Sequence, residues 1–403
     1  MVTNFCLVYS NVVATQLELP GLVPGPVHLV PRASARLAPR PSWVHREELP
    51  RNRLVAIDLF AGCGGFSLGL EMAGYAVWAA CEVDPFAAYT YRCNFPHVRL
   101  FEADIREMTY AQTSWRPPRL DLLVAGLPCQ PFSTLNRHRG ARDARRWLGL
   151  DFLRALDALR PRAFVIENVA TYARSHEADQ LRHGARDLGY HVGVSILDSV
   201  DFGVAQRRRR AFLAGSLGEP VQWPLPSHGG AEEQPHITVA QALAGLPLIP
   251  NGHAWHSSRP KVKDSSLVRY RAVPRDGGDR FAMAAHLDAD DLGHLVPVCW
   301  RGHRRVRTDV FGRMWWDRPA PTIRTEFYKP EKGRYLHPTE DRPITLREGA
   351  RLQSFPDEFA FPTDMTMNQV ARQIGNAVPP LLARAVGTAL ASALRTRRGR
   401  ALA

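Results

Sequence analysis

The sequence predicts an α/β protein with a doubly wound sheet of about seven strands and a smaller, loop-rich second domain. From Arg53 to Ala214, short apolar runs alternate with stretches of helical periodicity, which is the pattern of a doubly wound sheet. From about Leu225 the alternation is lost, and His, Pro, Gly, Trp and Arg become common. Because ligands of such sheets bind at the carboxyl ends of the strands, functional residues are expected there.

Seven apolar runs are predicted to be the strands of this sheet. They are Leu54–Phe60, Ala76–Cys81, Val98–Phe101, Leu120–Ala125, Ala163–Ile166, His191–Leu197 and Ala211–Ala214. Helices are predicted between them and after them. One runs from about Phe66 to Gly74, a second places Leu148, Phe152, Leu156 and Leu159 on one face, and the last spans Pro380–Leu394.

The bulk composition narrows the class of protein. The 403 residues carry a formal net charge of +13, and only four of the basic side chains are lysines. Such a surplus favours a polyanionic partner such as nucleic acid, although a surplus that serves solubility alone explains it equally well. The six cysteines form no C-x-x-C pair, so no metal site or disulfide framework is predicted. No signal peptide and no apolar run of membrane-spanning length is recognised, so a soluble intracellular protein is expected.

A glycine-rich turn follows the first predicted strand, in the segment Asp58–Phe66. Ser67 stands where a dinucleotide-binding motif has its third glycine, which argues against a pyrophosphate cradle. Glu82 and Asp104 follow the second and third strands and could accept hydrogen bonds from ribose hydroxyls and an adenine amino group. The set therefore fits an adenosine cofactor without a pyrophosphate, such as S-adenosylmethionine. The alternative is an ordinary glycine-rich turn with acids nearby by chance.

Two further motifs carry groups that suit covalent and acid–base chemistry. Cys129 lies in the proline-containing segment Gly126–Ser133 after the fourth strand, where it could act as a nucleophile. The alternative is that it is a small buried apolar residue, as most single cysteines are. Glu167, at the end of the fifth strand, could donate a proton if a closed site raised its pKa. Its alternative is an ordinary surface carboxylate.

Two more segments complete the motif set. The run Gln206–Arg210 precedes the seventh strand. If it is extended, Gln206, Arg208 and Arg210 share one face and Arg207 and Arg209 the other. Four consecutive arginines are also typical of a solvated or nucleic-acid-facing patch. The run Gln373–Pro380 precedes the final helix and could return the chain to the cofactor pocket through Asn376.

This ordered set resembles the C5-cytosine-specific DNA methyltransferase family of bacterial restriction–modification systems. The resemblance extends from Leu54 to about Leu394, except for the middle of the second domain. The matching blocks are Asp58–Gly65, Glu82, Asp104, Gly126–Ser133, Glu167–Val169, Gln206–Arg210, Arg347–Asp357 and Gln373–Pro380. Several such blocks in the right order are specific, whereas any one alone is not.

The resemblance implies a fold, a reaction and partners. It implies a Rossmann-like methyltransferase sheet in which S-adenosylmethionine supplies a methyl group to carbon 5 of a cytosine flipped out of duplex DNA. It divides the chain into an extension (1–50), a catalytic and cofactor-binding domain (51–224), a target-recognition domain (225–346) and a return segment (347–403). It also implies a cytoplasmic, nucleoid-associated monomer with a cognate restriction endonuclease encoded nearby. No membrane partner is expected.

The resemblance also implies a role for each matching residue. The catalytic set is Cys129 as nucleophile, Glu167 against ring nitrogen 3, and Arg208 and Arg210 holding the flipped base and the glutamate. The cofactor set is Phe60, Gly62, Gly64, Glu82, Asp104, Ile105, Pro128 and Asn376. The DNA-binding set is Gln130, Ser133, Asn168, Gln206, Thr322 and Arg324. Leu127 departs from the family's commoner proline.

Three other functions compete with this one. A tRNA cytosine-5 methyltransferase shares these motifs, but the Cys-Phe-Thr signature associated with that branch is absent, because Cys299 is followed by Trp300. A DNA-binding regulator without activity would not need Cys129, Glu167 and the arginine run together. A dinucleotide oxidoreductase is disfavoured by the missing third glycine.

Overall fold

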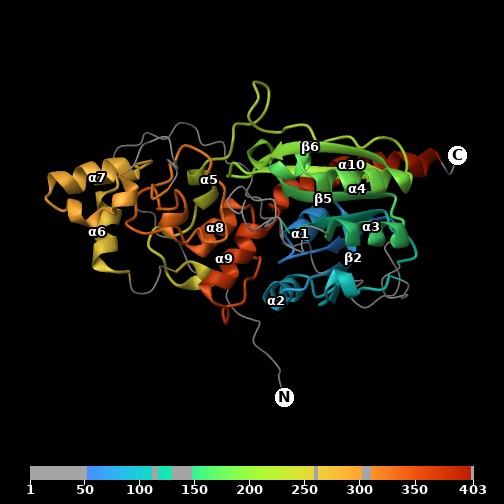
Figure 1. The fold of residues 1–403 in the computed structure, drawn as a ribbon, viewed down its shortest axis with the longest axis horizontal. Helices are drawn as coiled ribbons and strands as arrows, with labels where there is room; N and C mark the ends of the chain where they lie inside the picture. The colour runs from blue at the N-terminus through green and yellow to red at the C-terminus, as the bar shows by residue number, and fades with distance from the viewer. Residues whose placement is uncertain (1–51, 111–116, 129–147, 258–261, 302–309, 401–403) are drawn as a thin grey trace, which may run out of the picture.

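The computed structural model describes residues 52–110, 117–128, 148–257, 262–301 and 310–400. For residues 396–400 it describes the backbone alone. Figure 1 shows a long molecule in which the sheet and its helices occupy one end and helices α6 and α7 the other. The return segment runs from the middle of the molecule back to the sheet, and the C-terminal helix ends at the far side of it.

A seven-stranded mixed sheet forms the centre of the larger end. Its strands are β1 (Leu54–Leu59), β2 (Tyr75–Cys81), β3 (Arg99–Phe101), β4 (Leu122–Gly126), β5 (Ala163–Val169), β6 (His191–Asp198) and β7 (Arg209–Ser216), in the spatial order β3-β2-β1-β4-β5-β7-β6. The first five are parallel, whereas β7 runs antiparallel between β5 and β6. The predicted strand count and the α/β fold class are confirmed.

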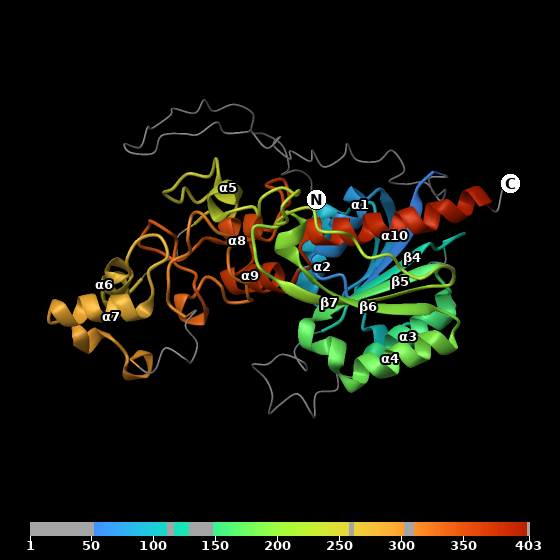
Figure 2. The same cartoon turned by 90° about the horizontal axis from the view of Figure 1, so that it is seen from above.

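Helices cover both faces of this sheet, as Figure 2 shows. The helices are α1 (Gly65–Met72), α2 (Pro85–Asn94), α3 (Leu148–Leu159), α4 (His176–Asp187), α5 (Val239–Leu243), α6 (Asp264–Ala272), α7 (Arg280–Ala289), α8 (Leu346–Leu352), α9 (Met367–Asn376) and α10 (Pro380–Arg400). Helices α1 and α10 lie on one face and α3 and α4 on the other. Each central strand buries both of its faces, which is why these runs are almost entirely apolar.

The two faces of the sheet belong to two separate apolar cores. Alternate strand residues point to opposite sides, so Ala56 and Val124 pack with α1 and α10, whereas Ile57 and Leu123 pack with α3 and α4. A third, smaller core around Tyr270, Met283 and Phe311 belongs to the far end of the molecule. In the described part of the second region, short helices and isolated bridges take the place of a sheet.

The return segment closes the larger core. Two glycines of α1 lie directly against it: a Cβ on Gly65 would collide with the Val378 carbonyl, and one on Gly69 would collide with Ala383. Met367–Arg395, which contains α9 and α10, is long and apolar enough by length and composition to cross a membrane. Leu382 and Val386 are buried in the core that α10 shares with α1, so packing inside the protein accounts for its apolar residues.

Candidate active site and cofactor pocket

The glycine-rich turn after β1 takes a backbone path that few side chains allow. Phe60, Gly62 and Gly64 all have positive φ, at 57°, 57° and 101°. A Cβ on Gly64 would collide with the ring of Phe95. Glycine is therefore required at Gly64 on two counts, conformation and space. The turn bends tightly enough to leave the carboxyl end of the sheet open.

Glu82, directly after β2, is hydrogen-bonded to the glycine turn. Its Oε2 accepts from the Gly62 N–H at 2.7 Å, and its Oε1 accepts from the Asp84 N–H at 2.8 Å. Burial raises the pKa of Glu82 above its ordinary value, while these two hydrogen bonds act in the opposite direction. The carboxylate is thus held in one orientation at the carboxyl ends of β1 and β2.

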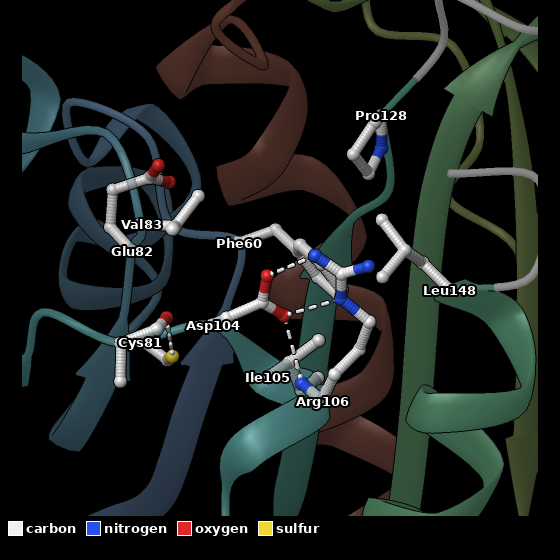
Figure 3. Close-up of a pocket in the computed structure, with 10 residues that line it drawn as sticks. Phe60, Cys81, Glu82, Val83, Asp104, Ile105, Arg106, Pro128 and Leu148 are labelled. Carbon is white, nitrogen blue, oxygen red and sulfur yellow. Dashed lines mark hydrogen bonds and ion pairs between the residues drawn. The ribbon is translucent and has the colours of Figure 1, made fainter. Parts of the chain in front are cut away.

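Asp104 caps a short 3₁₀ turn after β3. Its Oδ1 accepts from both the backbone N–H and the Nε of Arg106 at 2.9 Å, and Arg106 Nη2 donates to Oδ2 at 2.5 Å. These hydrogen bonds hold the pKa of Asp104 below its ordinary value. Figure 3 shows the Arg106 guanidinium lying between Asp104 and Leu148. A ligand that donates to Asp104 would share this carboxylate with Arg106.

These residues line one pocket at the carboxyl ends of the first four strands (Figure 3). Its lining is Phe60, Cys81, Glu82, Val83, Ala103, Asp104, Ile105, Arg106, Pro128 and Leu148. Two carboxylates on an otherwise largely apolar wall suit adenosine, which presents hydroxyl and amino donors on flat or apolar surfaces. The two acceptor carboxylates and the apolar wall therefore fit S-adenosylmethionine.

The predicted cofactor residues divide into two groups in the structure. Phe60, Glu82, Asp104, Ile105 and Pro128 line the pocket. Gly62 acts on it through its hydrogen bond to Glu82, and Gly64 shapes the turn. Asn376 is exposed at the end of α9 and does not line the pocket.

The sequence reasoning missed part of the pocket lining. The missed residues are Cys81, Val83, Ala103, Arg106 and Leu148. Cys81, Val83 and Ala103 are within two residues of a strand end, Arg106 lies in the 3₁₀ turn after β3, and Leu148 begins α3. Val83 is the one that the sequence could have indicated as a pocket residue, because it is apolar and follows a strand end. It is 64% exposed next to Glu82.

Glu167 is paired with Arg210 at the end of β5. Antiparallel pairing sets Arg210 opposite Val169 and so brings its side chain to the glutamate, with Nε 2.9 Å from Oε1. Glu167 is 6% exposed. Burial raises the pKa of Glu167, and the charges of Arg210 and then Arg208 oppose that rise. A buried carboxyl beside one arginine can hold a proton and release it when the surroundings change.

The other two arginines of the run face solvent. Arg207 and Arg209 are exposed, whereas Gln206 and Arg208 are buried and Arg210 is half-buried. The predicted alternation of this run is therefore present. The physical reason is that the segment is extended as it enters β7, so alternate side chains point to opposite sides.

Arg208 is hydrogen-bonded to main-chain carbonyls of distant segments. Its guanidinium donates to the carbonyls of Ile323 at 3.1 Å, Gly375 at 2.8 Å and Ala377 at 3.1 Å. It is 2% exposed. The side chain hydrogen-bonds to buried carbonyls from two distant segments, and its charge opposes the rise of the Glu167 pKa.

Gln206, which was predicted to contact DNA, lies inside the protein in this structure. Gln206 is fully buried. Its Nε2 donates to Gln353 Oε1 at 2.6 Å, and its Oε1 accepts from the Ile323 N–H at 2.7 Å. Both ends of the amide are used inside the protein, which sequence spacing does not show because the partners are more than 100 residues away.

The remaining predicted DNA-binding residues are placed differently from one another. Thr322 donates to the Arg207 carbonyl at 2.7 Å, and Arg324 is exposed with its Nη1 on the Lys332 carbonyl at 3.0 Å. Asn168 is buried, and its Oδ1 accepts from the Val169 N–H at 2.8 Å. Cys129, Gln130 and Ser133 lie outside the described residues.

Comparison with known proteins identifies the family. The model of the C-5 cytosine-specific DNA methylase family matches residues 54–392. The chain belongs to this family. Its members transfer a methyl group from S-adenosylmethionine to carbon 5 of cytosine in DNA.

Relatives and solved structures agree with this assignment. The Type II methyltransferase M.DdeI of Desulfomicrobium norvegicum is 32% identical over 364 residues, covering 82% of this chain and 86% of that protein. M1.HphI of Haemophilus parahaemolyticus is 32% identical over 355 residues, covering 84% and 86%.

One similar solved structure is a prophage-encoded Escherichia coli protein described as a DNA modification methyltransferase. It has a TM-score of 0.60 at 26% identity and covers 85% of this chain and 99% of that one. The Schizosaccharomyces pombe Dnmt2 methyltransferase matches with a TM-score of 0.57 at 19% identity, covering 86% and 99%. At that identity the likeness shows the fold alone.

Proposed function

We propose that this DNA (cytosine-5-)-methyltransferase protects one short duplex sequence as the modification partner of a restriction endonuclease. The support is that the relatives M.DdeI and M1.HphI, each matched over more than 80% of both chains, are Type II methyltransferases. On this proposal the enzyme acts as a monomer, associates with the nucleoid through DNA, and has a cognate endonuclease encoded nearby. Residues 225–346 would read the sequence, and 51–224 with 347–403 would carry the chemistry.

Glu167 is the residue whose geometry carries the catalytic assignment. A cytosine in the site would place ring nitrogen 3 against this buried carboxyl, whose raised pKa lets it donate a proton. Arg210 keeps the carboxyl oriented through the 2.9 Å ion pair. Protonation at nitrogen 3 withdraws electrons from carbon 6 and makes that carbon a better electrophile.

Cys129 is assigned to the covalent step. Its thiolate adds to carbon 6, and the electron pair of the 5,6 double bond becomes available at carbon 5. S-adenosylmethionine supplies the methyl group as a sulfonium-activated electrophile. Loss of the carbon 5 proton to a base, expulsion of the thiolate and return of the nitrogen 3 proton to Glu167 restore the aromatic ring and free the enzyme. Arg208 is assigned, with Arg210, to holding the flipped base and the glutamate, and its two terminal nitrogens also hydrogen-bond to main-chain carbonyls.

The remaining roles follow the pocket geometry. Glu82 and Asp104 would accept from the ribose hydroxyls and the adenine amino group, between Phe60, Ile105 and Pro128. Gly62 and Gly64 would shape the turn below them, and Asn376 would approach from α9. Gln130, Ser133, Asn168, Thr322 and Arg324 are assigned to the DNA side. Gln206 was predicted for the same side, and its amide is hydrogen-bonded to Gln353 and Ile323 in this structure.

Bisulfite sequencing of DNA from cells that express the protein tests this proposal. We expect one short motif to be methylated with the intact protein and not with a Cys129→Ala control. Duplex DNA and tRNA offered side by side to the purified protein separate the nearest alternative. Predominant methylation of tRNA, or methylation in the Cys129→Ala sample, would overturn the proposal.

A further inference from the structure

Three segments that are distant in sequence meet at one buried polar cluster beside the active site. They are the run that enters β7 (206–210), the recognition-side segment 322–325 and the segment 373–378, which is the end of α9 and the start of its link to α10. The side chains of Gln206, Arg208 and Gln353 join them, and all three are at most 2% exposed. We call these three side chains the polar hub.

The hub connects the segments through complementary hydrogen bonds. Gln206 accepts from the Ile323 N–H, and Arg208 donates to the Ile323 carbonyl. On the other side, Gln353 Nε2 donates to the Ile374 carbonyl at 2.6 Å, while Arg208 donates to the carbonyls of Gly375 and Ala377. The Gln206–Gln353 hydrogen bond closes the network. Neither outer segment can move without breaking buried hydrogen bonds.

Segment 373–378 is also in direct backbone contact on both sides. A Cβ on Gly375 would lie 2.5 Å from the Arg324 carbonyl carbon and the Thr325 nitrogen. A Cβ on Gly65 would collide with the Val378 carbonyl, and the Cys63 thiol lies 3.9 Å from the Gln373 carbonyl. The segment is therefore a wedge between the glycine turn of the cofactor pocket and the recognition-side segment.

We propose that the polar hub and this wedge couple cofactor binding to DNA binding, so that each ligand strengthens the other. If the glycine turn shifts on cofactor binding, Gly65 displaces the wedge at Val378. The hydrogen bonds of the hub then pass this displacement on to Ile323 and its neighbours. A packed contact that contains several buried hydrogen bonds transmits displacement, whereas a loose or solvated one absorbs it. The proposal rests on the assignment of segment 322–325 to the DNA side. Coupling of this kind is reciprocal, so it can be measured from either ligand.

The test is the affinity of the purified full chain for S-adenosylhomocysteine, with and without DNA. The DNA is a duplex carrying the motif found by bisulfite sequencing, and the coupling factor is the ratio of the two dissociation constants by calorimetry. We expect a factor of roughly five or more in the unaltered protein. Gln353→Met, which keeps the length but loses the amide, should lower it to less than about two. Arg208→Lys should lower it as well, because one ammonium cannot reach all three carbonyls.

Tyr335→Phe is the matched control. It removes the 2.7 Å hydrogen bond from the Tyr335 hydroxyl to the Thr322 carbonyl and the 3.3 Å hydrogen bond from the Arg324 N–H to that hydroxyl, both within the same recognition-side segment, and it leaves the three hub side chains in place. This variant should keep the full coupling factor even if its thermal stability falls. If Gln353→Met does not fold, Gln353→Glu serves instead, since it keeps the acceptor for Gln206 and loses the donor for Ile374.

Three results would overturn the proposal: no coupling in the unaltered protein, unchanged coupling in the hub variants, or equal loss in Tyr335→Phe. Failure of the proposed function looks different. In that case no duplex motif is methylated, so the coupling experiment has no duplex to use.

Discussion

At the scale of single residues, Glu167 shows how burial and one charge partner set the chemistry of a side chain. Water is excluded from the carboxyl, which raises its pKa, while Arg210 and then Arg208 limit the rise. Position in the sheet produces this balance, because antiparallel β7 brings Arg210 to the end of β5. A glutamate at the end of an open strand would instead have an ordinary pKa.

Glu167→Gln should bind S-adenosylhomocysteine normally but transfer methyl groups at least about 100-fold more slowly in a single turnover, because an amide has no acidic proton to donate. Rapid-quench measurement of labelled methyl transfer gives the rate, and calorimetry gives the affinity. Glu177→Gln is a matched control, since Glu177 is equally buried but belongs to α4. An unaltered rate in Glu167→Gln would remove this residue from the mechanism.

Asp58, behind the glycine turn, should make folding stability depend on pH. It is fully buried, its Oδ2 accepts from the Ser67 hydroxyl at 2.6 Å, and burial raises its pKa from 3.8 to about 7, with Glu82 adding to the rise. The folded protein therefore keeps this proton at pH values where the unfolded chain has lost it. This contribution to stability is fully present below pH 3.8, falls as the pH rises, and is lost once the pH has passed through about 7.

Asp58→Asn should remove this part of the pH dependence. Urea unfolding at pH 5 and pH 8 measures it: the unaltered protein should lose more stability than the variant over that interval, by up to about 3 kcal/mol. The absolute stability of the variant at one pH is not the criterion, because the amide also changes the hydrogen bonding to Ser67. Parallel losses in the two proteins would show that Asp58 does not titrate in this range.

At the scale of elements, the contact between α1 and α10 depends on glycine. Gly69 allows the start of α10 to approach so closely that an added Cβ would collide with Ala383 and lie 2.5 Å from the Pro380 carbonyl. Backbone atoms cannot move aside as a flexible side chain can. The helix after the glycine turn is thus fixed from behind by the last helix of the chain.

Gly69→Ala should destabilise the protein by about 1–3 kcal/mol through overpacking, although alanine favours a helix more than glycine does. The urea midpoint measures the change. Gly149→Ala in α3 is the control, because its nearest neighbour would be Leu181 at 3.4 Å, an ordinary contact. That variant should be neutral or gain up to about 1 kcal/mol. A Gly69→Ala midpoint equal to that of Gly149→Ala would contradict the close contact.

At the scale of the whole molecule, only part of the net charge of +13 is exposed where DNA could meet it. Arg208 is hydrogen-bonded to buried carbonyls, and Arg210 forms an ion pair with Glu167. Only part of the arginine run is therefore available to DNA. Arg207 and Arg209 are exposed on the opposite side of the same run. A sequence count of positive residues therefore overstates the charge that DNA meets.

Replacing Arg207 and Arg209 together by alanine should weaken DNA binding and make it less sensitive to salt. Each lost phosphate contact reduces the slope of log K against log salt by roughly 0.9, so the double variant should lose up to about two units. Fluorescence anisotropy from low to moderate salt measures the slope. Arg186→Ala, an exposed arginine on α4, should leave the slope unchanged. Equal slopes for all three proteins would place DNA elsewhere.

Much of the fold and part of the site were predictable from local sequence. Apolar runs identified the seven strands because buried strands need them, and the motif order identified the family because several rare blocks coincide. Phe60, Glu82, Asp104 and Ile105 were predictable as pocket residues, since each follows the carboxyl end of a strand and parallel strands present those ends together.

Only the tertiary structure decided the partners of the buried polar groups. Gln206 and Arg208 share a face with Arg210, as expected, yet their hydrogen bonds go to Gln353, Ile323 and Gly375, all more than 100 residues away. Local periodicity shows which way a side chain points. It does not show which partner the side chain meets, because the partner depends on how distant segments pack against each other.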